Sequence, residues 1–146
     1  MLDAYRDLIE GLTEESTTLR EMLGDPAPAD LPADVVTLLK EVRAREAAML
    51  RRAQKIMRGE NVNLRAIENE PDVVNYAAVE GTPDELLQGI LIDRGELVSL
   101  LINLTLKDWE RKVPHWVEGE TTLSDEVEIH LTWEEDMIPR FEAALG

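Results

Sequence analysis

The chain has 146 residues, a formal net charge of −16, 44% hydrophobic and 32% charged residues, and no cysteine. These values indicate one folded globular domain over residues 1–146, and they exclude a disordered chain, a disulfide framework and any thiolate metal site or cysteine nucleophile. The N-terminal residues lack the basic and apolar regions of a secretion signal, and the most apolar segment, residues 97–106, is too short for a membrane span, so we expect a cytoplasmic protein without a membrane partner.

Apolar residues that recur every three or four positions predict the first two helices. The first is expected over residues 2–23, where Gly24 and a proline-rich turn end it. The second is expected to start within residues 32–34 and to end at Gly59. Seven basic and two acidic residues fall within residues 40–58, so the second helix carries a locally basic face.

The segment over residues 60–81 has no clear period, although two short helical turns are expected within DVVNYAAVE. A connection of this length inside a compact domain requires a structural reason. The simplest is a crossover that returns the chain to the end where the second helix began. The crossover makes the second and third helices parallel.

The third helix opens with a clear boundary signal. Thr82 is expected to cap it, Pro83 occupies its first position, and Glu85 completes a capping box. Its apolar stripe continues as far as Trp109, and we expect Pro114 to end the helix and residues 115–121 to form the turn into the fourth.

The fourth helix is expected over residues 122–145, and its apolar face is interrupted by His130 and Glu134, which lie one turn apart. Four amphipathic helices predict an all-α fold, a four-helix bundle with a long crossover between helices 2 and 3. In that arrangement Glu46 and Arg94, both on inward faces, fall close to the height of Glu134. The sequence therefore predicts a buried polar cluster of Glu46, Arg94, Glu134 and His130.

This cluster admits three interpretations. In the first, Arg94 compensates the buried carboxylates in a structural network, and no cofactor is needed. In the second, His130, Glu134 and Glu46 bind a divalent transition metal (Zn, Ni, Mn or Fe), although the guanidinium competes with the metal for the same carboxylates. In the third, Glu134 or His130 is a general base tuned by burial. The competing arginine favours the structural network.

Single residues across the chain resemble the DinB/YfiT-like superfamily of four-helix bundles. A glutamate common on that family's second helix matches Glu46, and the other matching residues are Arg94, the Leu-rich run after it, Trp109-Glu110-Arg111, His115, Gly119, Thr122-Leu123 and the closing helix. The resemblance implies an up-down-down-up bundle and often a homodimer. Metal-binding members of the family use three histidines, and some members are thiol-dependent transferases, isomerases or hydrolases.

Those three histidines are absent here. The histidine of the second helix falls on Glu41, and the HxxxH pair of the fourth falls on Glu134 and Ile138, or one turn earlier on His130 and Glu134. We therefore expect a degenerate metal site in a protein of unknown substrate that acts as a ligand-binding or structural, dimeric domain. The alternative is a divalent-metal-dependent thiol transferase or hydrolase that uses His130, Glu134 and Glu46.

Two further features bear on partners. His115 and Trp116 fall in the expected turn, where they either line the mouth of a pocket or form an ordinary pair of a turn histidine and a packed tryptophan. The basic face of the second helix offers nucleic-acid binding as a second alternative, but no aromatic side chains interleave with its arginines, and the net charge repels polyanions. We expect a small-molecule ligand rather than nucleic acid.

Overall fold

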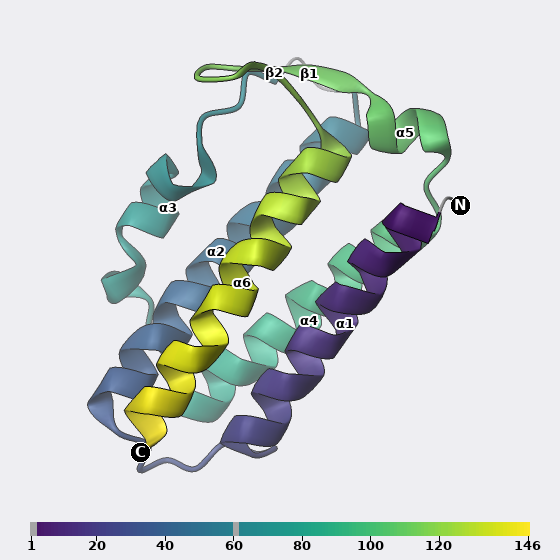
Figure 1. Ribbon diagram of the computed structural model, residues 1–146. Coiled ribbons are helices and arrows are strands. Elements are labelled where there is room, and N and C mark those ends of the chain that lie inside the picture. The colour runs from purple at the N-terminus through teal and green to yellow at the C-terminus, as the bar shows by residue number, and fades with distance from the viewer. Residues whose placement is uncertain (1–2, 60–61) are drawn as a thin grey trace.

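A computed structural model describes residues 3–59 and 62–146, and in it four long helices pack together lengthwise (Figure 1). They are α1 (Asp3–Leu23), α2 (Ala33–Met57), α4 (Pro83–Ile102) and α6 (Leu123–Leu145). The prediction of four main helices is confirmed, and position 2 of the first helix lies outside the described residues. Within the described residues, none of the helices combines the length and the hydropathy that a membrane span requires.

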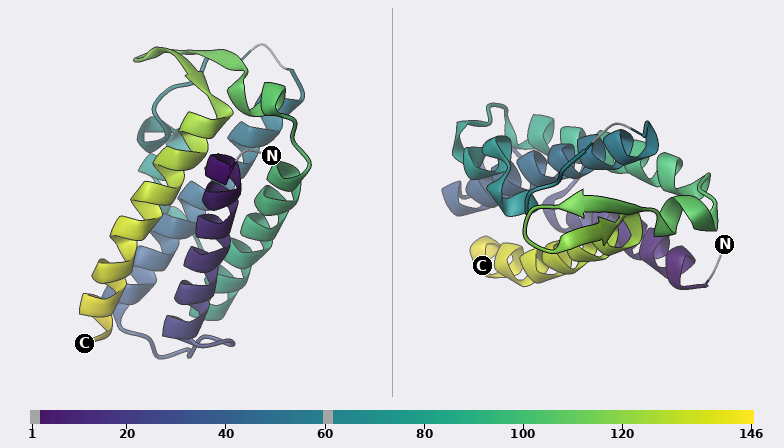
Figure 2. Two further views of the ribbon diagram at one scale, coloured as in Figure 1. Left: turned by 45° about the vertical axis from the view of Figure 1, so that its right-hand side comes forward. Right: turned by 90° about the horizontal axis from the view of Figure 1, so that it is seen from above.

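Helices α2 and α4 run in the same direction, and α1 and α6 run in the opposite one (Figures 1 and 2). The connection from α2 to α4 passes along the outside of α2 (Figure 1) and contains η1 (Ile67–Asn69), α3 (Pro71–Val74) and η2 (Tyr76–Ala78). The two short helical turns predicted within DVVNYAAVE are confirmed as α3 and η2. Residues 60 and 61 of this connection lie outside the described part of the chain.

The start of α4 follows the predicted capping box. The Thr82 hydroxyl accepts the Glu85 N–H at 3.2 Å, and the Glu85 carboxylate accepts the Thr82 N–H at 3.0 Å. In the same turn, the Asp84 carboxylate accepts the Ala27 N–H at 3.0 Å. This bond holds the start of α4 beside the connection between α1 and α2, at one end of the bundle.

The predicted continuation of the third helix to Trp109 and Pro114 is wrong. Helix α4 ends at Ile102, and a separate short helix, α5 (Leu106–Glu110), follows it. The reason is a second capping box, in which the Thr105 hydroxyl accepts the Asp108 N–H at 3.2 Å and the Asp108 carboxylate accepts the Thr105 N–H at 3.0 Å. A new helix start at this point turns the chain across the end of the bundle, where Trp109 is buried.

An antiparallel hairpin of β1 (Lys112–His115) and β2 (Gly119–Thr122) makes the fold mostly α rather than all-α, so the prediction of a plain turn over residues 115–121 is also wrong. The side chains of β1 alternate between exposed and buried positions, as a half-buried strand requires. Strand β1 also pairs with Leu64, whose N–H donates to the Pro114 carbonyl at 3.0 Å. The Leu64 carbonyl accepts the Trp116 N–H at 2.8 Å, which attaches the hairpin to the crossover.

The apolar core is divided into two parts along the bundle. The part nearest the hairpin contains side chains such as Leu12, Met49 and Leu97, and the other contains side chains such as Leu19 and Phe141. On each long helix, the residues between the two parts lie at one level. That level holds the buried side chains of Glu46, Arg94 and Glu134.

Candidate functional site

The polar layer between the two core parts consists of Glu46 from α2, Arg94 from α4, and His130 and Glu134 from α6. None of these four side chains is more than 2% exposed. Each lies on the inward face of its helix because it follows the apolar residues at helical spacing. The structure therefore brings together all four residues of the buried cluster that the sequence predicts.

Arg94 is the centre of this layer. Its Nε donates to Glu46 Oε2 at 2.8 Å and its Nη2 donates to Glu46 Oε1 at 2.6 Å, which is a bidentate arginine–carboxylate pair. Nη2 also donates to the Glu134 carboxylate, and Nη1 donates to the Leu12 carbonyl of α1 at 2.5 Å. A single guanidinium on α4 thus binds groups on the other three long helices.

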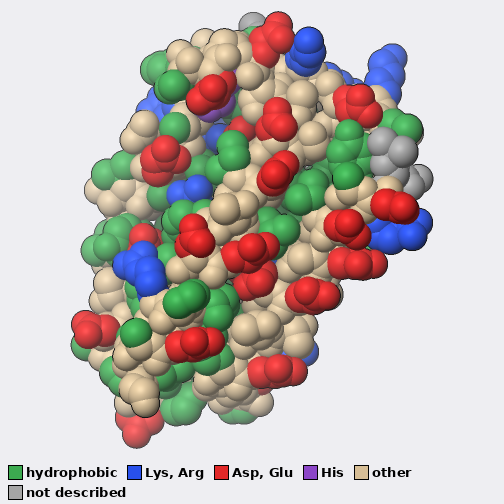
Figure 3. Space-filling view, in the orientation of Figure 1, with side chains coloured by type: hydrophobic (Ala, Val, Ile, Leu, Met, Phe, Trp, Pro, Cys, Tyr) green, Lys and Arg blue, Asp and Glu red, His purple; other side chains and the backbone are tan. Residues whose placement is uncertain are grey.

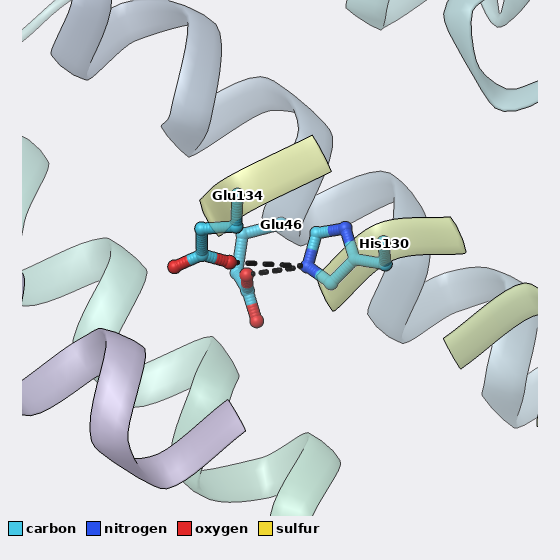
Figure 4. Close-up of side chains that lie close together, drawn as sticks. All are labelled: Glu46, His130 and Glu134. Atoms are coloured by element: carbon cyan, nitrogen blue, oxygen red, sulfur yellow. Dashed lines mark hydrogen bonds and ion pairs between the residues drawn. The ribbon is translucent and has the colours of Figure 1, made fainter. Parts of the chain in front are cut away.

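His130 completes the layer from α6. Its Nε2 lies 2.8 Å from Glu46 Oε1 and 3.6 Å from Glu134 Oε2, and Figure 4 shows the three side chains directed toward one another. Because an ionised carboxylate only accepts hydrogen bonds, Nε2 carries the ring hydrogen and donates a hydrogen bond to Glu46 Oε1. Among the described residues, nothing hydrogen-bonds to His130 Nδ1 or to Glu134 Oε1.

The two carboxylates of the layer have opposite pKa shifts. Burial raises the pKa of Glu46, but the charges of Arg94 and His130 and their hydrogen bonds outweigh burial and lower it to about 2. Burial also raises the pKa of Glu134, the neighbouring Glu46 charge raises it further, and Arg94 offsets these effects incompletely. Glu46 is therefore the permanent anion of the layer, and Glu134 is the carboxylate that protonates more readily.

The donor set of this layer does not fit a metal. Three ligand atoms from Glu46, His130 and Glu134 do lie within 4.8 Å of one another. However, the Arg94 guanidinium already donates to both oxygens of Glu46 and to Oε2 of Glu134, so a positive charge holds the carboxylates that a cation needs. Of the other two positions considered for a metal in the sequence analysis, Glu41 Oε2 lies 3.9 Å from Arg140 Nη1, and Ile138 offers no ligand atom.

His115 and Trp116 point in different directions. His115 is buried on the inward side of β1, and its Nδ1 accepts the N–H groups of Val117 and Glu118, each at 3.1 Å. Trp116 is 64% exposed and lies under the Arg65 guanidinium, with 5.2 Å from Arg65 Cζ to the ring centre. Trp116 is therefore not the packed tryptophan of the ordinary alternative.

His115, one of the two residues considered from the sequence for the mouth of a pocket, lines a cavity of about 1070 Å³, and Trp116 does not line it; the sequence analysis did not predict the arginines in its wall. Residues of α2, the η1 segment, the hairpin and α6 form its walls, and they include two arginines of α2, Arg45 and Arg52. None of the four residues of the polar layer lines it. The available signal was the spacing of seven between Arg45 and Arg52, which places both on one face of the helix.

Arg52 donates hydrogen bonds to three acceptors at the wall of this cavity. Its Nη1 donates to the Glu126 carboxylate at 2.5 Å, and its Nη2 donates to the Arg65 carbonyl at 2.7 Å and to the Glu70 carboxylate at 2.9 Å. The other oxygen of Glu126 accepts the Thr121 hydroxyl at 2.8 Å. These bonds connect α2, the crossover, β2 and α6, and they give the cavity a fixed wall.

Comparison of the chain with protein families, with curated proteins and with solved structures found no match. The chemistry of the polar layer and of the cavity is therefore the basis for judging function.

Proposed function

We propose that this chain is a DinB-like bundle of the up-down-down-up type in which an ion cluster centred on Arg94 replaces the family's metal site. We further propose that it acts as a small-molecule-binding domain rather than as a metal-dependent enzyme. The first proposal is supported by the bidentate hydrogen bonds from Arg94 to Glu46 and by the contact of Arg94 with Glu134. The cavity between α2 and α6 supports the second part.

Charge balance explains why such a cluster is stable. Two buried carboxylates need compensating positive charge, and Arg94 supplies it by pairing with both of them. A metal site in the same place requires the guanidinium to leave, because both cations need the same oxygens. The choice between a structural cluster and a metal site is thus a choice between two cations.

The test is Arg94→Met, which removes the resident cation and keeps similar volume. We expect the variant to lose about 3–5 kcal/mol of unfolding free energy, because two buried carboxylates are left uncompensated. The control adds Glu46→Gln and Glu134→Gln to the same chain, which removes the uncompensated charge and recovers most of the loss. Urea denaturation measures both effects.

Titration with Zn, Ni, Mn and Fe completes this test. The native protein is expected to take up no stoichiometric metal, whereas Zn is expected to recover part of the stability that Arg94→Met loses. Stoichiometric uptake and stabilisation in the native protein would overturn the proposal. That outcome would favour the alternative of a metal-dependent thiol transferase or hydrolase that uses His130, Glu134 and Glu46.

The arginines of α2 give little support to nucleic-acid binding. Arg43 pairs with Asp93 at 2.6 Å and Arg51 pairs with Asp72 at 3.1 Å, while Arg45 is buried. The face shown in Figure 3 carries many acidic side chains over α1 and α6. The homodimer expected from the resemblance stays a prediction.

A further inference from the structure

The cavity between α2 and α6 contains a buried cation that has no hydrogen bond or ion pair to any described residue. Arg45 is 5% exposed and lines the cavity. Within residues 3–59 and 62–146, no acceptor forms a hydrogen bond or ion pair with its guanidinium. Its close contact is the face of Trp133, with 4.5 Å from Cζ to the ring centre. Since an unpaired buried charge is costly, Arg45 points to an anionic group supplied from outside the chain.

The other cavity residues show that Arg45 is the cation available to a ligand. Arg52, which lines the same cavity, already donates to two carboxylates and a carbonyl. His115 adds a neutral donor, because its Nδ1 accepts two backbone N–H groups and the ring proton therefore resides on Nε2. The cavity thus offers one cation and one further N–H to an acceptor group.

The exposed residues around the cavity have the opposite charge. Six exposed carboxylates line it, and they are Glu68, Glu118, Glu120, Asp125, Glu128 and Asp136. The whole chain adds to this negative potential with its net charge of −16. A ligand with several negative charges is repelled, whereas one carboxylate with a nearby ammonium matches both the buried arginine and the acidic surround.

We propose that this cavity binds a small zwitterion of amino-acid or short-peptide size. Its carboxylate lies on Arg45, His115 Nε2–H is a second donor, and its protonated amine faces the acidic surround. The connecting carbons have apolar surface to contact at Trp133, Ile129 and Val117. This inference rests on the ligand-binding part of the proposed function and does not depend on the Arg94 cluster.

Three matched probes test it: 6-aminohexanoate carries both charges, hexanoate carries the carboxylate alone, and hexylamine carries the ammonium alone. Each is titrated into the ¹⁵N-labelled full chain and followed by amide and side-chain chemical shifts. We expect 6-aminohexanoate to give saturable shifts at Arg45, His115 and Trp133, with at least tenfold tighter binding than either singly charged probe. If hexanoate and 6-aminohexanoate bind equally tightly, or if no probe gives a saturable shift, the proposal of a zwitterionic ligand is overturned.

Variants assign the site to the arginine. Arg45→Met is expected to weaken binding of 6-aminohexanoate at least tenfold while the melting temperature is kept or raised, because the arginine has no hydrogen bond or ion pair to lose among the described residues and methionine can still pack against Trp133. The control is Arg51→Met, since Arg51 lies on the same helix, outside this cavity, and pairs with Asp72. Unchanged binding in Arg45→Met overturns the proposal. Failure of these binding tests is distinguishable from failure of the Arg94 cluster, which the metal titration decides alone.

Discussion

Arg94 divides its hydrogen bonds unequally between two neighbouring glutamates, and this division sets their protonation. It donates twice to Glu46 and once to Glu134, and His130 adds a closer contact to Glu46 than to Glu134. Positive charge therefore compensates Glu46 almost fully, and Glu134 bears the cost of burial. Two carboxylates with divergent pKa values are typical of acid–base pairs, but here both are enclosed by the four helices.

We expect the unfolding free energy of the protein to decrease at acid pH because Glu46 becomes protonated. Its pKa is about 2 in the fold against an ordinary value of 4.5, so its contribution to stability is complete above pH 4.5 and is lost as the pH falls from 4.5 toward 2. The linked free energy is about 3 kcal/mol, from about 1.4 kcal/mol per pH unit. We expect Glu46→Gln to be less stable at neutral pH and to lose less additional stability across this range. Urea unfolding at a series of pH values measures the difference.

Glu134→Gln is the matched control for this pH dependence. The raised pKa of Glu134 means that its contribution favours folding at low pH and is lost as the pH rises through its folded value. The glutamine variant should therefore retain the acid-side loss of the native chain. An acid-side slope in Glu46→Gln equal to that of the native protein would show that other carboxylates control acid unfolding.

The burial of the four residues of the polar layer could be predicted from the sequence. The burial of Arg45 could not be predicted, and the reason is physical. Glu46, Arg94 and Glu134 interrupt apolar stripes, and the helical period alone places them inside. Arg45 lies at the edge of its stripe, where a charged residue is ordinarily solvated. Its burial depends on Trp133 and on the crossover, whose positions the period of α2 does not determine.

At the level of helices, a glycine sets the contact between α1 and α6. A Cβ at Gly11 would meet Leu131 Cδ2 at 2.7 Å, closer than carbon atoms approach. Gly95 on α4 has open space around the same position. Both glycines lie inside helices, so both carry the conformational cost of glycine there, but only Gly11 is matched to a close neighbour.

We expect Gly11→Ala and Gly95→Ala to change stability in opposite directions. Gly95→Ala should gain about 0.5–1 kcal/mol from helix propensity alone. Gly11→Ala should lose about 1 kcal/mol or more, because overpacking against Leu131 exceeds the same gain in propensity. Chemical denaturation of the two variants measures both values. Equal stabilisation would mean that Leu131 moves aside at no cost.

The helix and strand predictions that were wrong concern short segments. Residues 105–108 repeat the threonine–acid spacing of the α4 start, but the apolar stripe runs on past Ile102 and hides the break. The strands have four residues each, too few for a period of two to be distinct. Strand β1 also pairs with Leu64. Leu64 is far from β1 along the chain, so a local sequence pattern does not reveal this pairing.

Across the whole molecule, Arg52 connects parts of the chain that the helical core does not hold. It binds Glu126 at the start of α6 and both the Arg65 carbonyl and Glu70 in the crossover. The crossover in turn pairs with the hairpin through Leu64. One buried guanidinium therefore stabilises the hairpin end of the bundle as a unit.

Removing that connection should loosen this end selectively. We expect Arg52→Met to lose about 3 kcal/mol, because it leaves the buried Glu126 without its partner. Hydrogen exchange should accelerate most at the amides of Leu64 and Trp116, which pair the crossover with β1. Arg51→Met, whose ion pair is exposed, should change stability by less than about 1 kcal/mol. Uniform acceleration across α4 would indicate global destabilisation instead.

The three tryptophans of this chain lie in three different environments. Trp109 is fully buried and stacks on Tyr5 with 4.8 Å between ring centres, Trp133 lies half-buried beneath Arg45, and Trp116 is exposed on the hairpin. The fluorescence of each tryptophan therefore reports on a different part of the molecule. A chain that keeps only Trp109 reports the melting of the core, one that keeps only Trp133 reports occupancy beside the guanidinium, and one that keeps only Trp116 reports the solvent at the hairpin tip.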